Sequence, residues 1–416
     1  MGNTGNLNEK GKPNLFEYAT SELSQDAFLA WFFAWIRADS SHQISSAARM
    51  YLTILLNSKP NRDTPSPILE GDIDECEVQT QVSVKVKGKN VRKADLVLEV
   101  KLKGSKEKMA VIIEDKTHSS NNEQKLKDYK TGLLDKVENG VKYKAVIGIL
   151  FKSGYTSREE REIATRAEYS VANFQDFLNI LEPLSGKSEI INDYYLWHRA
   201  IQMDLNHRSQ LLRTPLPERV IKDLFWTGGD TNAGQYKCND AAIFEKCMEY
   251  LLEGLLPDSV SLRERDRWSL FFSNSGLPCS QFGIATFENV YGKGWHEYLF
   301  YRIDWRARSY YLSLRQYAWI DKKSDQYMSR LEIKNKRLEQ LRNLAKDCLP
   351  LDSQVKPFKE RPSHGKYESE VWVHFFMDGS PAEIREDFQS FHCAFIKRLE
   401  SKQHKLPNIQ DVAESL

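Results

Sequence analysis

Two stretches of sequence decide the fold of the first half of this chain: Arg92–Leu98, which reads RKADLVL, and Met109–Lys116, which reads MAVIIEDK. Each joins a short apolar run to charged residues, as expected for a strand that ends at the margin of a sheet. Side chains two positions apart on a strand share a face, so Glu114 and Lys116 point the same way. If the two strands are neighbours, Asp95 lies beside Glu114.

The flanking patterns indicate an α/β architecture. Valines alternate with polar residues from Val78 to Val86, which is the period of a half-buried strand, and this strand pairs with Ala94–Val100 as a hairpin. The continuous apolar run Ala145–Phe151 predicts a strand buried on both faces. Helices are expected at residues 20–36, 45–56, 121–136 and 170–181. This order predicts a central mixed β-sheet flanked by helices.

The second half has a different pattern, and we predict an α+β domain of its own. Strands are expected at residues 268–273, 282–287, 298–304, 310–315 and 371–376, and helices at residues 241–255, 324–346 and 381–399. Prolines at 215 and 217 mark a boundary. We predict a disordered tail over residues 1–13, a first domain over residues 14–215 and a second domain over residues 216–416. The second domain is expected to recognise a substrate, a partner or a ligand.

Composition excludes several classes of protein. The chain has 416 residues, a formal net charge of +1 and 28% charged residues, which is typical of a soluble globular protein. No apolar run is long enough to span a bilayer, and residues 1–13 have no signal-peptide core, so we expect a cytoplasmic protein without a membrane partner. The six cysteines form no CxxC pair, so neither a zinc ribbon nor a disulfide framework is indicated.

The carboxyl groups of Asp95 and Glu114 would repel each other at close range unless a positive charge lies between them. A divalent cation supplies that charge, and hard oxygen ligands suit Mg²⁺, with Mn²⁺ as a substitute. The ammonium of Lys116 would then lie near a metal-bound water and a scissile phosphate. These three residue types together form a hydrolytic site for a phosphodiester.

The segments around Asp95 and Glu114–Lys116 resemble the motifs of the PD-(D/E)XK nuclease superfamily. Asp95 corresponds to the first acid and Glu114-Asp115-Lys116 to the E-x-K element, although Ala94 stands where the proline belongs. If Asp115 were the acid, Thr117 would stand in the lysine position, so Glu114 is preferred. The resemblance implies a restriction-endonuclease-like fold, a nucleic-acid substrate with DNA favoured over RNA, and a role in restriction, repair or, first, defence against phage. Superfamily members frequently act as dimers, so the resemblance is also compatible with a homodimer.

A second match lies in Glu22–Trp31, ELSQDAFLAW, which resembles the opening helix of one bacterial branch of these nucleases. On this match Glu22 supplies the acidic residue of the helix and binds metal. Asp26 lies one turn later on the same face and is the alternate candidate. Glu22 also suits a purely structural role at the positive N-terminus of a helix.

A weaker third match lies in Gln124–Tyr129, QKLKDY, where this branch commonly has Gln-Leu-x-x-Tyr. Lys125 occupies the glutamine position and Gln124 precedes it, which leaves the accessory polar role unassigned. Lys125 and Tyr129 are secondary candidates for contacts with the nucleic-acid backbone, although packing on the helix surface accounts for them equally well. His118 is a further secondary candidate: it shares a face with Glu114 and Lys116 if the strand continues that far, and would then contact a phosphate or the attacking water. A solvated histidine in a loop is the preferred alternative.

Three alternatives stay open. The acids and the lysine are compatible with surface salt bridges, but charges at the margin of a buried sheet are costly unless they are paired. The chain is also compatible with a nucleic-acid-binding protein that kept the fold and does not cut. A third alternative is a regulatory protein dominated by its second domain. In that domain, residues 302–342 mix basic and aromatic side chains. This pattern is typical of nucleic-acid contacts, but it is also typical of a solvated helix and core strands, which is the slightly preferred interpretation.

Overall fold

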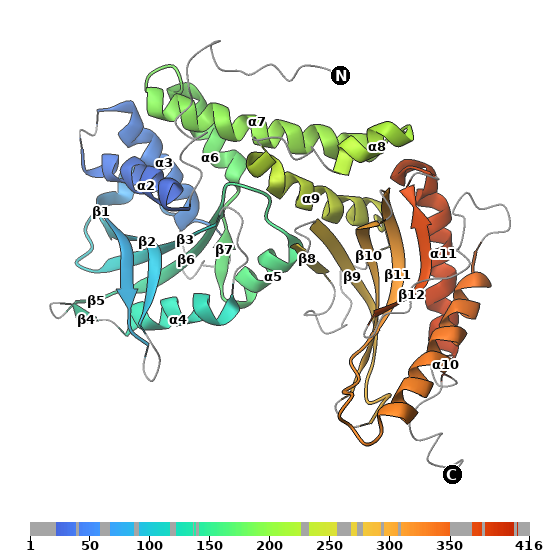
Figure 1. Ribbon diagram of the computed structural model, residues 1–416. Coiled ribbons are helices and arrows are strands. Elements are labelled where there is room, and N and C mark those ends of the chain that lie inside the picture. Colours follow the sequence, from blue (N-terminus) through green and yellow to red (C-terminus); the bar gives the residue numbers. More distant parts are fainter. Residues whose placement is uncertain are drawn as a thin grey trace. The chain divides into compact units, whose positions relative to one another are not determined.

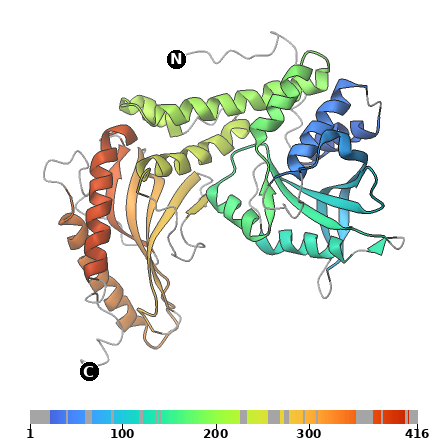
Figure 2. The ribbon, with the colours of Figure 1, turned by 180° about the vertical axis from the view of Figure 1, so that it is seen from behind.

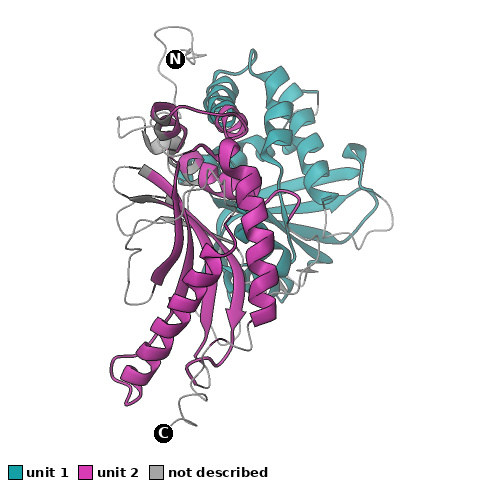
Figure 3. Cartoon of the chain, turned by 90° about the vertical axis from the view of Figure 1, so that its right-hand side faces the viewer, with its two compact units in different colours: residues 1–204 teal, residues 205–416 magenta. Residues whose placement is uncertain are grey.

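In the computed structural model the description covers residues 22–38, 41–58, 67–86, 91–116, 122–135, 137–138, 141–225, 233–255, 268–272, 278–292, 295–306, 309–349, 368–376, 379–402 and 406. The tail expected over residues 1–13 lies outside these ranges. The chain forms two compact units, residues 1–204 and 205–416, coloured separately in Figure 3. The change of unit falls within one long helix, α7 (Glu189–Leu211), while the predicted boundary at residue 215 stays a prediction.

The first unit is built on a five-stranded mixed sheet with the order β1-β2-β3-β6-β7. Its strands are β1 (Ile73–Val84), β2 (Arg92–Leu102), β3 (Lys108–Lys116), β6 (Ala145–Lys152) and β7 (Tyr169–Val171). β1, β2 and β3 pair antiparallel, whereas β3 pairs parallel with β6, and β6 with β7. The expected mixed α/β sheet is therefore confirmed.

Helices cover both faces of this sheet, as Figures 1 and 2 show. One face packs against α2 (Glu22–Ala34), α3 (Gln43–Leu56), α6 (Phe174–Leu181) and the first part of α7. The other face packs against α4 (Glu123–Leu134) and α5 (Arg158–Arg166). Three 3₁₀ turns (Trp35–Arg37, Glu70–Asp72 and Glu182–Leu184) and a small ribbon of β4 (Val137–Glu138) and β5 (Val141–Lys142) complete the described part of the unit.

The end of the first domain differs from the sequence prediction. The helix expected from Ser170 begins at Phe174, because Asn173 caps it, and Tyr169–Val171 is instead the edge strand β7. Gly148 on β6 makes this pairing possible, since a Cβ at that position would lie 2.5 Å from the Tyr169 ring. Helix α5 was not predicted from the sequence, although Ser157 caps its first turn.

The second unit has a five-stranded antiparallel sheet with the order β12-β11-β10-β9-β8. The strands are β8 (Trp268–Phe272), β9 (Pro278–Phe287), β10 (Glu297–Arg306), β11 (Ser309–Ala318) and β12 (Glu368–Phe375). The helices are α8 (Glu218–Phe225), α9 (Ala233–Leu251), α10 (Tyr327–Lys346) and α11 (Pro381–Lys402). This confirms the α+β class. No helix in the described ranges is long and apolar enough to cross a membrane.

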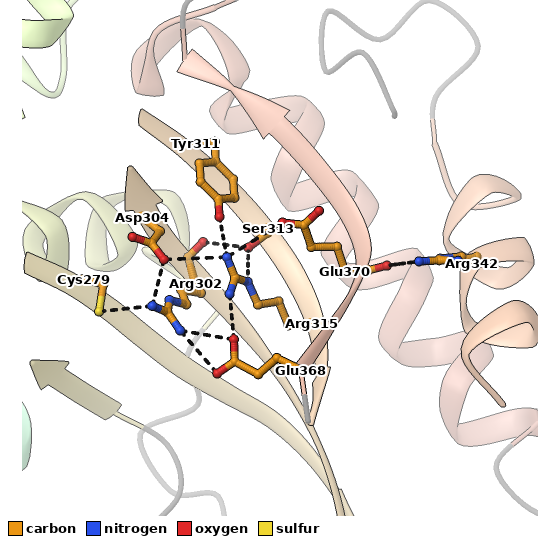
Figure 4. Close-up of polar contacts among 9 residues, drawn as sticks. All are labelled: Cys279, Arg302, Asp304, Tyr311, Ser313, Arg315, Arg342, Glu368 and Glu370. Atoms are coloured by element: carbon orange, nitrogen blue, oxygen red, sulfur yellow. Dashed lines mark hydrogen bonds and ion pairs between the residues drawn. The ribbon is translucent and has the colours of Figure 1, made fainter. Parts of the chain in front are cut away.

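Charged side chains in this second sheet pair with one another (Figure 4). Arg315 lies 2.6 Å from Glu368, which also accepts from Arg302 at 3.2 Å. Arg302 in turn lies 2.7 Å from Asp304. Tyr311 is only 3% exposed. Arg302, Arg315 and Tyr311 therefore belong to a network of paired side chains within the sheet, as expected for residues of core strands.

Candidate active site

The register of two antiparallel strands brings the predicted acids together. Leu96 on β2 lies opposite Ile113 on β3, and the same register continued by one residue sets Asp95 opposite Glu114. Lys116 Nζ lies 3.3 Å from Asp95 Oδ2 and 3.1 Å from Glu114 Oε1. The three side chains therefore converge on the α4 face of the sheet, and an arrangement with the two acids on opposite faces is excluded.

Burial makes this cluster electrostatically strained. The Glu114 side chain is 0% exposed, that of Lys116 8% and that of Asp95 16%. Burial raises the pKa of Glu114, and the nearby Asp95 raises it further, while Lys116 and Lys125 act in the opposite direction. Ion pairing with ammonium groups thus partly offsets the cost of placing a carboxylate in the sheet interior.

Asp26 on helix α2 lies close enough to the cluster to be affected by its charges. Its pKa is raised to about 7 by burial first and then by Asp95, while the ammonium of Lys116 lowers it. Gln81 on β1, whose φ of 51° is left-handed, is 3.5 Å from Asp26. The side chain of Glu22 lies outside the described part of the chain. The charge of Asp95 acts on the alternate candidate, Asp26, and the choice between the two acids of α2 stays a prediction.

A hydrogen-bonded brace behind the acids joins α2 to the sheet. Gln25 donates to Asp115 Oδ1 over 2.6 Å and accepts from the Ser153 hydroxyl over 2.5 Å. Asp115 is 1% exposed and lies on the face opposite Glu114, as the strand period predicts. Sequence reasoning missed this role of Gln25. No local signal reveals it, because the partners are 90 and 128 residues away.

Helix α4 brings Lys125 to the site and leaves Gln124 outside it. Lys125 Nζ lies 2.8 Å from Glu114 Oε1, and the Tyr129 hydroxyl donates to the Lys93 carbonyl over 2.5 Å. Gln124 instead donates to Asp128 on its own helix over 2.9 Å. His118, the remaining secondary candidate, lies outside the described residues.

The donor chemistry of the cluster fits a hard divalent cation. Glu114 Oε2 and Asp26 Oδ1 are both buried, and neither has a hydrogen-bond partner among the residues described. Carboxylate oxygens are the ligands that Mg²⁺ and Mn²⁺ prefer. Within the same residues, no group of three or more His, Cys, Asp or Glu side chains is arranged to hold a metal ion. The residues present thus supply suitable oxygen donors, although the full ligand set is not assembled among them.

The region that contains this cluster is similar to a known protein family. Residues 13–203 match the family model of the PD-(D/E)XK nuclease superfamily. Neither a curated protein nor a solved structure gives a significant match to the chain. The matched region contains the mixed sheet, the acids and the lysine described above. Nucleases of this kind typically use divalent metal ions and act on nucleic acid.

Proposed function

We propose that residues 13–203, which match the family model of the PD-(D/E)XK nuclease superfamily, are a metal-dependent nuclease that hydrolyses phosphodiester bonds. We take DNA as the preferred substrate over RNA, and Mg²⁺ as the natural ion with Mn²⁺ able to replace it. One observation carries the proposal: the ammonium of Lys116 lies within 3.3 Å of carboxylate oxygens from two neighbouring strands.

Three acids are assigned to the metal. Asp95 and Glu114 would hold it from adjacent strands, and an acid of α2 would approach as the third, Glu22 as the sequence predicts, with Asp26 as the alternate. When bound, such an ion lowers the pKa of water to the physiological range and polarises a phosphate oxygen. Burial supports this assignment, because Glu114 has an oxygen with no hydrogen-bond partner in the described part of the chain.

Lys116 has the catalytic role in this proposal. Its side chain is 8% exposed, and its ammonium also donates to the Asp115 carbonyl over 2.6 Å, so its position is fixed. A fixed ammonium beside the acids orients the attacking water and balances negative charge that develops on the phosphate. Such preorganised charge acts strongly here because the site is largely shielded from solvent.

Incubation of the full chain with plasmid, linear duplex, single-stranded DNA and RNA tests the function, in Mg²⁺, in Mn²⁺ and in chelator. We expect cleavage that requires metal and that falls at least about 100-fold in Asp95→Asn and Lys116→Ala. Lys101→Ala is the matched control, since Lys101 lies on the same strand as Asp95 but pairs with Asp74 instead. Cleavage by Lys116→Ala at the control rate would refute the role of the lysine. Binding without cleavage by the wild type would favour the non-cutting alternative.

The wider context is proposed on resemblance alone. We place a cytoplasmic defence or restriction role first, with recognition of a substrate, a partner or a ligand assigned to the second domain. Plating of phage on cells that express the wild type or Asp95→Asn tests the defence role, and equal plaque counts would refute it. A salt-dependent gel shift with the full chain, before and after substitutions in the second unit, tests recognition.

A further inference from the structure

A second ammonium group contacts the central carboxylate of the site. Lys125 Nζ lies 2.8 Å from Glu114 Oε1, the same oxygen that Lys116 Nζ approaches to 3.1 Å. Position 125 therefore supplies Glu114 with a second cation. A neutral amide would leave Glu114 with one cation instead of two.

The start of α4 is anchored so that Lys125 faces Glu114. The side chain of Asn122 accepts a hydrogen bond from the Lys125 backbone over 3.0 Å and caps the helix. One turn later, the Tyr129 ring lies 5.4 Å from Lys125 Nζ, and its hydroxyl is tied to the Lys93 carbonyl. The helix backbone is thus fixed at both positions, and only the four-carbon stem of Lys125 has freedom to move.

The two ammonium groups differ in how tightly the fold holds them. The Lys116 side chain is 8% exposed and bonds both acids and a backbone carbonyl. The Lys125 side chain is 32% exposed, while the Glu114 side chain that it contacts is 0% exposed. Displacing Lys125 into solvent therefore disturbs little of the surrounding structure, whereas displacing Lys116 would break a buried network.

We propose that Lys125 couples metal binding to substrate binding. It neutralises Glu114 before a divalent ion binds, competes with that ion for the carboxylate, and then turns its free charge toward a phosphate of the substrate. The inference rests on the proposed function, since it takes Glu114 as a metal ligand. Its physical basis is that two cations at one buried oxygen repel each other, and the more exposed and flexible one yields.

The proposal predicts effects of opposite sign for one substitution. Lys125→Gln removes the competing cation, so Mn²⁺ should bind about three- to tenfold more tightly. The same change removes a phosphate contact, so nucleic acid should bind more weakly, and the slope of log K against log salt should fall by about one. A contact that only supports the fold would not strengthen metal binding.

Calorimetric titration of the full chain with Mn²⁺ measures the first effect. Fluorescence anisotropy of a labelled DNA duplex in Ca²⁺, across a range of salt, measures the second. Lys127→Gln is the matched control, because Lys127 lies on the same helix, pairs with Glu123 at 2.8 Å and is away from the acids. Lys125→Arg should restore both wild-type values, since it keeps the charge.

Mn²⁺ binding by Lys125→Gln that is no tighter than that of Lys127→Gln would overturn the coupling. So would an unchanged salt dependence of DNA binding. These outcomes leave the proposed function intact if the wild type still cuts DNA in metal. Wild-type protein that binds no Mn²⁺ would overturn the proposed function and the coupling together.

Discussion

Replacing Asp26 by asparagine should stabilise the metal-free protein at neutral and alkaline pH. Asp26 is 5% exposed, and burial together with the Asp95 charge raises its pKa from 3.8 to about 7. The folded chain therefore keeps a proton on Asp26 that the unfolded chain loses above about pH 4. Between these two pKa values the unfolded state becomes progressively more favourable as pH rises, so this residue lowers stability.

The size of the effect follows from the same pKa change. A rise from 3.8 to about 7 corresponds to at most about 4 kcal/mol of stability above pH 7, and screening and relaxation of neighbours reduce it. We expect Asp26→Asn to gain about 1–2 kcal/mol over wild type at pH 8 and little at pH 4.

Urea unfolding in chelator at pH 4, 5, 6, 7 and 8 measures the difference, with Asp74→Asn, an exposed acid on β1, as the control. The gain should grow between about pH 4 and 7 and then level off, while Mn²⁺ affinity and cleavage fall. A difference that is the same at pH 5 and pH 8, or a variant less stable than wild type at pH 8, would refute the reasoning.

Three further substitutions probe the scaffold. Gln25→Ala removes the side-chain amide that donates to the buried carboxylate of Asp115 on β3. This change should lower the free energy of unfolding by about 1–3 kcal/mol, measured in urea, and should slow cleavage. Arg337→Met removes the guanidinium that pairs with Glu297, whose side chain is fully buried. This change should lower the free energy of unfolding of the second unit by about 3–5 kcal/mol in the same assay, and a smaller loss would contradict the assigned role of the pair. Gly148→Ala places a methyl 2.5 Å from the Tyr169 ring and should lower the thermal midpoint, whereas Gly71→Ala, with nothing within 4 Å, should not.

The elements with a strong period were predictable from sequence. The expected strands at residues 94–100, 109–113 and 145–151 lie within β2, β3 and β6, because continuous apolar runs of that length fit a buried sheet. The short edge strand Tyr169–Val171 escaped the pattern, since three residues carry no period. Its strand character comes from pairing with Gly148–Leu150, which lies 21 residues earlier.

The candidate site was predictable in part for a related reason. Strand alternation alone sets Glu114 and Lys116 on one face and Asp115 on the other. The choice between Glu22 and Asp26 depends on how α2 docks on the sheet, and neighbouring turns of one helix look equivalent in sequence. The contact of Lys125 with Glu114 likewise depends on where α4 lies over β3, which the local pattern does not determine.

Two buried carboxylates, Glu114 and Glu297, differ in a way that favours a functional role for the cluster of Asp95, Glu114 and Lys116. Glu297 in the second unit is 0% exposed, and both of its oxygens accept hydrogen bonds from Arg337, with Gln316 and Tyr291 as additional donors. Glu114 is equally buried, yet Oε1 meets two ammonium groups while Oε2 has no hydrogen-bond partner among the described residues. A carboxylate kept for stability alone gains from saturation by fixed donors, as Glu297 is. An oxygen withheld from such partners in a buried site is available to bind a cation, as the proposed function requires, and lost stability is the expected consequence.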